Sequence, residues 1–185
     1  HDHAITNLKL SFDGKYFVSA SEKGTLIKIF DIQNNTIIKE VRRGCDPTKI
    51  TDIKFSDNNT TLLVSSVKGT IHLYNTDISN DNSIEKNKTT NLDNIWGVNS
   101  IKKFVPNKLK PSYFGSEWSF CQIYIPNIIS YSIVNNLKNK IYSFGSDGQF
   151  YEICFKDTKN PTVDKIIKYI SDENDPFSER TSTIK

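Results

Sequence analysis

Apolar and polar residues alternate in short runs along most of the chain, and turn-forming residues separate these runs. Asp13-Gly14 and Lys23-Gly24 are two such separators. A period of two places alternate side chains on the same face of a β-strand, so each run predicts a strand with one buried face. In the first part of the chain the expected strands cover residues 6–12, 16–20, 25–30 and 37–42.

The strand pattern repeats along the chain. Ser21-Glu22-Lys23-Gly24-Thr25 aligns with Ser66-Val67-Lys68-Gly69-Thr70, at a spacing of about 45 residues. A third, weaker unit has expected strands at 120–125, 128–134, 140–144 and 150–155, and a last strand at 163–170. Repeats of this length with four strands each are typical of WD40-type β-propeller blades, so we expect an all-β chain of about three blades and no long helix.

The expected units have the following boundaries: one blade at 1–44, a second at 45–118, a third at 119–170 and a polar tail at 171–185. Within the second unit the strand spacing fails from about 75 to 110. Residues 75–94 are rich in Asn, Asp, Ser, Thr and Lys with almost no apolar side chains. This composition predicts a long, mobile surface loop.

Charge and cysteine content exclude several classes of function. The net charge is only +3, and no aromatic and basic stripe is present, which disfavours nucleic-acid binding. The three cysteines, Cys45, Cys121 and Cys154, are widely spaced, so we interpret them as reduced thiols in a cytosolic protein. The sequence contains no nucleophile elbow, P-loop or metal-ligand spacing, and we expect neither an enzyme nor a cofactor.

One segment between the first two units is more specific. The run from Glu40 to Pro47, which contains Arg42-Arg43-Gly44, resembles the signature Phe-Arg-Arg-Gly or Leu-Arg-Arg-Gly of the PROPPIN family, with Val41 in its first position. The segments 19–28, 65–72 and 113–119 are similar to the fifth blade, the sixth blade and the passage into the seventh blade of that family. The resemblance covers residues 1–156 and implies the C-terminal blades of a seven-bladed propeller, with the N-terminal half of the same propeller as a partner.

The PROPPIN resemblance implies binding to phosphoinositide membranes through two headgroup sites. Arginine suits such sites because its planar guanidinium can bond two phosphate oxygens and stays protonated. Neighbouring residues of a strand point to opposite faces, so Arg42 and Arg43 are expected in different pockets. By matching position, site one would contain Arg42, Lys28, Ser21, Thr25 and Lys23. Site two would contain Arg43, His72, Ser66, Thr70, Ser65 and Lys68.

Each of these residues also has a structural interpretation. The two arginines could pair with Glu40 and Asp46 at the surface. The hydroxyls of the turns could stabilise those turns, and the turn lysines could be solvated. Lys28 stands where the family more often has arginine, and this exchange removes a bidentate fork from site one.

The long loop of the second unit corresponds, in the resemblance, to the family's membrane-inserting loop. The candidate membrane anchors are Ile95, Trp96, Phe104 and Leu109, although these side chains could instead pack inward. The implied function is recognition of phosphatidylinositol 3-phosphate and the 3,5-bisphosphate by a peripheral protein of autophagosomal or endosomal membranes, together with autophagy-related proteins. The alternative is a WD40 protein-interaction scaffold with little lipid dependence.

Overall fold

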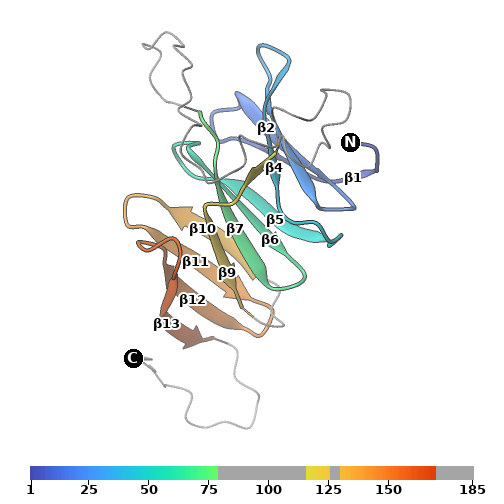
Figure 1. Ribbon diagram of the computed structural model, residues 1–185. Helices are drawn as coiled ribbons and strands as arrows, with labels where there is room; N and C mark the ends of the chain where they lie inside the picture. The colour runs from blue at the N-terminus through green and yellow to red at the C-terminus, as the bar shows by residue number, and fades with distance from the viewer. Residues whose placement is uncertain (79–115, 126–129, 170–185) are drawn as a thin grey trace, which may run out of the picture.

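The structure is a computed structural model that describes residues 1–78, 116–125 and 130–169. The described part is all β and forms three sheets that follow one another through the molecule (Figure 1). The first sheet has the order β1 (Ile5–Leu10), β2 (Tyr16–Ser21), β3 (Leu26–Asp31), β4 (Thr36–Arg42) and β8 (Glu117–Trp118). The second sheet contains β5 (Ile50–Phe55), β6 (Thr61–Ser66), β7 (Thr70–Asn75) and β9 (Cys121–Tyr124). The third sheet contains β10 (Ser130–Asn135), β11 (Lys140–Gly145), β12 (Gln149–Cys154) and β13 (Thr162–Lys168).

The same glycine turn joins the second and third strands of all three sheets. Gly24, Gly69 and Gly148 have φ values of 60°, 76° and 72°, in the left-handed region that favours glycine. Each glycine N–H donates to the carbonyl three residues earlier, at 2.9 Å, 3.0 Å and 3.0 Å. These turns confirm the repeat that the sequence predicts, and they give the three sheets corresponding positions.

The second sheet is packed between the other two. One apolar cluster joins its Leu62, Val64 and Tyr74 to Ile27 and Val41 of the first sheet. A second cluster joins the opposite face of the second sheet to the third sheet: Leu63, Ile71, Leu73, Ile123, Ile141, Tyr151 and Ile153. Burying each large aliphatic side chain contributes about 1.5–3 kcal/mol, so sheet stacking is the main source of stability.

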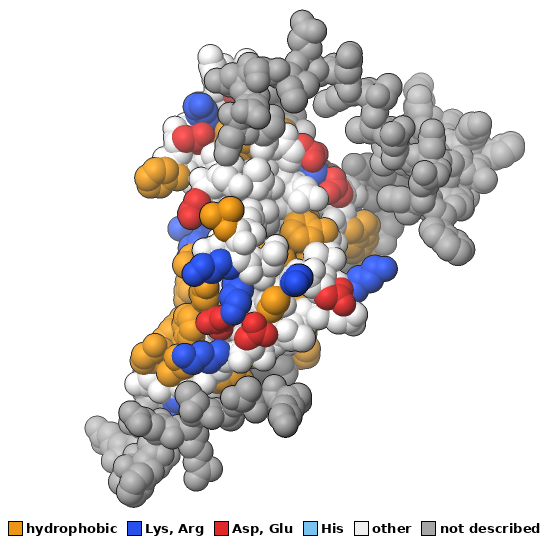
Figure 2. All heavy atoms as spheres, turned by 90° about the vertical axis from the view of Figure 1, so that its left-hand side faces the viewer, with side chains coloured by type: hydrophobic (Ala, Val, Ile, Leu, Met, Phe, Trp, Pro, Cys, Tyr) orange, Lys and Arg blue, Asp and Glu red, His pale blue; other side chains and the backbone are white. Residues whose placement is uncertain are grey.

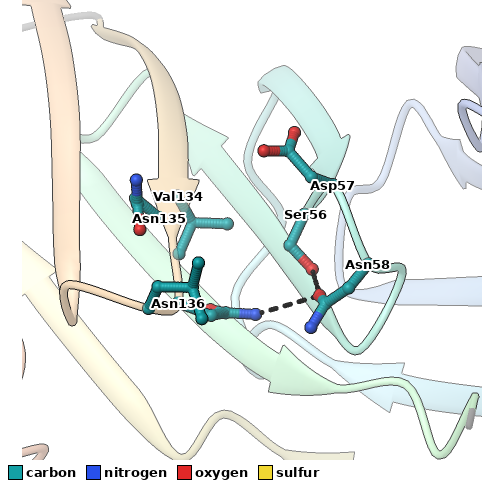
Figure 3. A pocket seen from close by; sticks show the side chains of 7 residues that line it. Ser56, Asp57, Asn58, Val134, Asn135 and Asn136 are labelled. Atoms are coloured by element: carbon teal, nitrogen blue, oxygen red, sulfur yellow. Dashed lines mark hydrogen bonds between the residues drawn. The ribbon is translucent and has the colours of Figure 1, made fainter. Parts of the chain in front are cut away.

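A polar clamp joins the second and third sheets at one end. The Nδ2 group of Asn136, in the turn between β10 and β11, donates to Asn58 Oδ1 at 3.3 Å, Thr60 Oγ1 at 3.1 Å and Thr61 Oγ1 at 3.0 Å. Figure 3 shows Asn136 pointing toward Asn58 beside a cavity of about 170 Å³. The clamp therefore fixes the spacing of the two sheets where their apolar cores end.

Two strands differ from the sequence-based assignment. We expected residues 120–125 in the third unit, but β9 pairs with β7 and completes the second sheet. In addition, β8 pairs in parallel with β4 of the first sheet. The chain thus leaves the second sheet after β7, adds a strand to the first sheet and then returns. Non-local pairing of this kind has no signature in the local alternation of residues.

Three predictions concern residues outside the described part. The expected loop at about 75–110 falls mostly within 79–115, and the tail at 171–185 is likewise not described. The anchor candidates Ile95, Trp96, Phe104 and Leu109 lie in the same undescribed range.

Each outer sheet has a face with exposed apolar side chains. On the first sheet Leu8 and Leu10 are exposed, next to Phe17, whose ring stacks on that of Phe30 with 4.4 Å between centroids. On the third sheet the exposed set is aromatic and aliphatic: Tyr131, Ile133, Phe144 and Tyr169. On the face of the molecule in Figure 2, hydrophobic side chains lie at the surface among acidic and basic ones. Propeller blades normally bury both faces, so we expect these two faces to be covered in solution.

The first testable prediction follows from these two faces. We expect residues 1–185, prepared alone, to self-associate or to melt without a sharp transition, because apolar sheet faces are costly in water. Sedimentation velocity and thermal melting followed by circular dichroism would measure both properties. A monodisperse monomer with a cooperative transition would contradict the prediction.

Candidate functional site

The two adjacent arginines lie where β4 ends, at the rim between the first and second sheets. Arg42 is the last residue of β4 and pairs with Leu26, whereas the preceding Val41 pairs with Ile27 and faces the core. Arg42 therefore lies on the face of the first sheet that points away from the second sheet. Both arginines are largely buried, with exposed fractions of 7% and 8%.

Arg43 is tied to the glycine turn of the first sheet. Its Nε donates to the carbonyl of Gly24 at 3.1 Å, and its Nη2 donates to the carbonyl of Asp46. Its backbone N–H donates to the carbonyl of Thr25 at 2.9 Å. Burial lowers the pKa of Arg43, although arginine stays protonated in proteins. The structure thus holds a fixed positive charge at the rim.

The second sheet presents a histidine to this charge. His72 of β7 pairs with Val64, so it lies on the face that packs against the first sheet. Its Nδ1 is 3.1 Å from Ser119 Oγ, and its buried Nε2 has no hydrogen-bond partner within the described residues. Burial, assisted by the positive charge of Arg43, lowers the pKa of His72 to about 4. His72 is therefore neutral at physiological pH, with one ring nitrogen left without a partner.

The other site-two residues divide between two faces. Ser66 and Thr70 share a hydrogen bond of 2.8 Å and flank the glycine turn on the His72 side. Ser65 pairs with Ile71, whose side chain belongs to the core shared with the third sheet. The structure therefore places Ser65 on the face opposite His72. Lys68 is exposed at the tip of the turn.

The site-one residues gather around Arg42 with an acidic neighbour. Lys28 and Glu40 are cross-strand partners on the Arg42 face, and Lys28 Nζ lies 3.8 Å from Glu40 Oε2. Ser21 is buried at the end of β2. Thr25 and Lys23 lie in the glycine turn, Thr25 buried and Lys23 exposed. Because Glu40 offsets the charge of Lys28, this site is less suited to a phosphate than the one around Arg43.

The third sheet repeats the turn without this chemistry. Gly145 occupies the position of Ser21 and Ser66, and Asp147 that of Lys23 and Lys68. The hydroxyl of Tyr151, at the position of His72, donates to the Asp147 carboxylate. Burial, together with this hydrogen bond, raises the pKa of Tyr151. An acidic turn repels phosphate, so the arrangement around Arg43 is specific to the rim between the first two sheets.

Three neighbours of the site were missed by sequence reasoning. The hydroxyl of Tyr74 donates to the carbonyl of Arg42 at 3.1 Å and holds the arginine segment against β7. The alternation of residues in β7 carried this signal, because Tyr74 shares a face with His72. Ser119 and Glu117 enter through the non-local pairing of β8, which no local pattern indicates.

A comparison with protein families identifies the repeat. Residues 1–31 and 39–75 match the family described as WD domain, G-beta repeat. The chain is 31% identical to SVP1-like protein 2 of Debaryomyces hansenii, covering 95% of the chain and 42% of that protein. It is 29% identical to autophagy-related protein 18e of Arabidopsis thaliana, covering 84% of the chain and 38% of that protein. The chain belongs to the PROPPIN family.

Solved structures agree on the fold of this PROPPIN chain. Hsv2 of Kluyveromyces marxianus superposes with a TM-score of 0.63 at 16% identity, over 92% of the chain and 48% of Hsv2. KlAtg21, solved in complex with the coiled-coil of AgAtg16, superposes with a TM-score of 0.62 at 22% identity, over 92% of the chain and 43% of that protein. The chain spans less than half of the length of these relatives. The three sheets are thus consecutive blades of a partial propeller.

Metal-ligand groups and membrane-spanning helices are both absent from the described PROPPIN residues. Residues 1–78, 116–125 and 130–169 contain no group of three or more side chains placed to hold a metal ion. The same ranges contain no helix whose length and apolar content would allow it to span a bilayer.

The close approach of Gly24 to the backbone of Thr48 leads to a prediction about stability. A Cβ atom on Gly24 would lie 1.9 Å from the carbonyl oxygen of Thr48, whereas one on Gly14, which also has a positive φ, would meet nothing within 4 Å. We expect Gly14→Ala to cost about 1 kcal/mol of unfolding free energy, from the left-handed backbone alone. We expect Gly24→Ala to cost on the order of 3 kcal/mol or more, because the backbone at Thr48 must move. Urea denaturation of the complete propeller would measure both values, and equal losses would contradict the predicted contact.

The buried histidine generates a prediction about pH. The pKa of His72 is about 4 in the folded chain and about 6.5 when unfolded, so between these values the unfolded chain binds the extra proton. Its contribution to stability is complete above pH 6.5 and falls as the pH decreases toward 4. We expect a loss of about 2 kcal/mol between pH 7 and pH 5 that His72→Phe removes.

The matched control is His3, whose side chain is 51% exposed. Unfolding free energies of the complete propeller, as wild type, His72→Phe and His3→Gln, would be measured at both pH values. If His72→Phe keeps the full pH dependence, another group causes it.

Proposed function

We propose that this chain forms the phosphoinositide-binding edge of a PROPPIN propeller and recognises phosphatidylinositol 3-phosphate and the 3,5-bisphosphate on membranes. One observation carries the proposal: the fixed guanidinium of Arg43 lies near the neutral ring of His72, whose buried Nε2 has no partner within the described residues. Buried polar atoms in proteins are nearly always hydrogen-bonded, and an unpaired one indicates a missing ligand or water. A phosphate oxygen beside Arg43 would supply that partner.

The chemistry of site two suits a phosphate group. If Ser119 donates to Nδ1, then Nε2 of His72 carries the proton and can donate to an oxygen anion. The hydroxyls of Ser66 and Thr70 add neutral donors on the same face, and exposed Lys68 adds charge at the entrance. Asp46 contributes a backbone carbonyl rather than its carboxylate. Convergent donors of this kind favour a compact, multiply charged headgroup over a diffuse polyanion.

Site one would act as a second, weaker contact. Arg42, Lys28 and Ser21 lie on the opposite side of the first sheet, and Glu40 lies within reach of Lys28. Two weak sites on one rigid edge strengthen each other, because binding at one raises the local concentration of lipid at the other. The anchor candidates Ile95, Trp96, Phe104 and Leu109 would add an apolar contact. Two separate headgroup sites therefore favour attachment to a membrane surface over binding of a single soluble ligand.

The proposed setting is the cytoplasmic face of autophagosomal or endosomal membranes, where the chain would be a peripheral protein without catalytic activity or a cofactor. The remaining blades of the propeller would cover its two open faces. Autophagy-related proteins are the proposed protein partners, because relatives include an autophagy-related protein and KlAtg21 bound to a coiled-coil.

The same likeness to KlAtg21 favours a second candidate function. A WD40 scaffold that binds a coiled-coil partner by its surface, with little dependence on lipid, would also fit the propeller fold. The two functions differ in whether the arginines are needed for membrane attachment.

The fourth prediction tests the arginines. Because each hydrogen bond to a charged group is worth about 1.5–3 kcal/mol, Arg42→Ala or Arg43→Ala should weaken vesicle binding roughly tenfold or more. The double variant should lose far more, since both headgroup contacts disappear. Vesicle sedimentation with phosphatidylinositol 3-phosphate, and with unphosphorylated phosphatidylinositol, would measure the difference.

Two further variants separate binding from folding. Arg43→Lys keeps the positive charge but removes the guanidinium whose Nε donates to the carbonyl of Gly24. Lys15→Ala removes an exposed positive charge far from the rim. Melting temperatures would be measured for every variant. If the double variant stays folded and binds phosphorylated vesicles like wild type, the scaffold function replaces the lipid-binding one.

A further inference from the structure

An exposed tryptophan lies beside the first arginine, on a strand that the local sequence does not predict. Trp118 is 45% exposed and pairs with Arg42 in the parallel contact between β8 and β4. Register partners in neighbouring strands point to the same side of a sheet, so Trp118 shares the outer face with Arg42. Because β8 is the edge strand of the first sheet and lies farthest from β1, the indole ring is at the margin of this face, away from the exposed Leu8 and Leu10 of β1 that a further blade would cover.

Several contacts hold β8 at this edge. Lys39, whose side chain is only 8% exposed, contacts Glu117 Oε2 at 2.6 Å and Asp77 Oδ2 at 2.8 Å, and donates to the carbonyl of Asn75 at 2.7 Å. On the other side of the strand, Ser116 Oγ donates to Glu40 Oε1 at 2.7 Å. A short two-residue strand rarely stays in place through its backbone alone. These side-chain contacts therefore fix Trp118 relative to Arg42.

The charges around Trp118 suit an anionic surface. The carboxylates of Glu117 and Glu40, in β8 and β4, are each within ion-pair distance of a lysine, Lys39 and Lys28 respectively. Pairing reduces the repulsion that a free carboxylate would exert on phosphate. Arg42 lies on the same face and carries a positive charge. An apolar ring beside a cation is the combination found at the boundary between lipid headgroups and acyl chains.

We propose that Trp118 is a membrane-interface contact of site one, whose indole enters the headgroup layer when Arg42 binds a phosphoinositide. This inference rests on the proposed lipid-binding function and adds to it a residue of the described structure. Indole rings prefer that layer because one edge is apolar and the N–H can bond to headgroups or water. Trp118 would then set how deeply the edge of the propeller sits in the membrane.

Residues 1–185 contain two tryptophans, Trp96 and Trp118, and a difference between two variants isolates the emission of Trp118. The spectrum of Trp96→Phe minus that of Trp96→Phe/Trp118→Phe gives the contribution of Trp118, whatever other tryptophans the complete propeller contains. Emission would be recorded, in the complete propeller, with phosphatidylcholine vesicles that contain phosphatidylinositol 3-phosphate and with phosphatidylcholine vesicles alone. We expect a blue shift with the phosphorylated vesicles only, and quenching when the lipids carry bromine in the upper part of their acyl chains.

Affinity provides the second measurement. We expect Trp118→Ala to weaken binding to the phosphorylated vesicles roughly tenfold, because about half of a large aromatic surface no longer leaves water. Trp118→Phe should retain most of the binding. Affinity for soluble inositol 1,3-bisphosphate should stay unchanged in both variants, since the headgroup donors remain, whereas Arg42→Ala should lose it at site one.

Phe12 is the matched control for a general loss of apolar surface. It is 98% exposed and lies in the turn between β1 and β2, at the end of the first sheet opposite Arg42. We expect Phe12→Ala to bind vesicles like wild type. An equal loss in Phe12→Ala and Trp118→Ala would overturn the assignment of Trp118.

The outcomes separate this inference from the function on which it rests. If the wild-type propeller binds neither type of vesicle, the lipid-binding function fails and this inference fails with it. If the phosphorylated vesicles bind while the emission of Trp118 and the affinity of Trp118→Ala do not change, only the interface contact is refuted.

Discussion

Both faces of the second sheet are covered, one by the first sheet and one by the third, and every residue of β6 is buried as a result. A sheet in this position has no solvated side on which polar residues can be placed without a partner. Some of its polar side chains find partners at the rim, whereas the buried hydroxyl of Ser65 has none within the described residues. Ser66 is hydrogen-bonded to Thr70, and His72 is hydrogen-bonded to Ser119, at the rim where the apolar cluster ends.

The packing between the first and second sheets also fixes the position of the Arg43 charge. Arg43 follows directly after β4, whose Val41 packs in the core between the first two sheets, so its backbone position is set by that core. Tyr74 extends from the same core to the carbonyl of Arg42. The guanidinium then bonds two carbonyls of the surrounding loops instead of moving freely. A charge held in this way needs little further ordering on binding, which reduces the entropic cost of recognition.

The sequence predicts the local parts of this structure and misses the non-local ones. Alternation gives the strands β1 to β4 and β10 to β13 within one or two residues, because most of these strands have one face in a core. Gly24, Gly69 and Gly148 mark their turns because a left-handed backbone favours glycine. The pairings of β8 and β9 depend on which strands of the sheets have an unpaired edge. The residues of β8 and β9 do not themselves indicate which strands these are. Ser65 and His72 point to opposite faces of the second sheet, because only alternate residues of a strand share a face. Placing both in site two was therefore geometrically wrong.

The three glycine turns provide a comparison within one molecule. Their backbones share the same hydrogen bond and left-handed glycine, yet only the first two carry a serine, a lysine and a threonine, and the third carries Gly145, Asp147 and Gln149. The blade therefore does not create the candidate site, because the third blade has the turn without the cations. What distinguishes the rim of the first two sheets is the arginine pair of the connecting segment, in which Arg43 bonds the first turn and lies near His72 of the second sheet. Selection for phosphate binding would act on that segment and on His72, while the turn glycines would be kept for folding in all three blades.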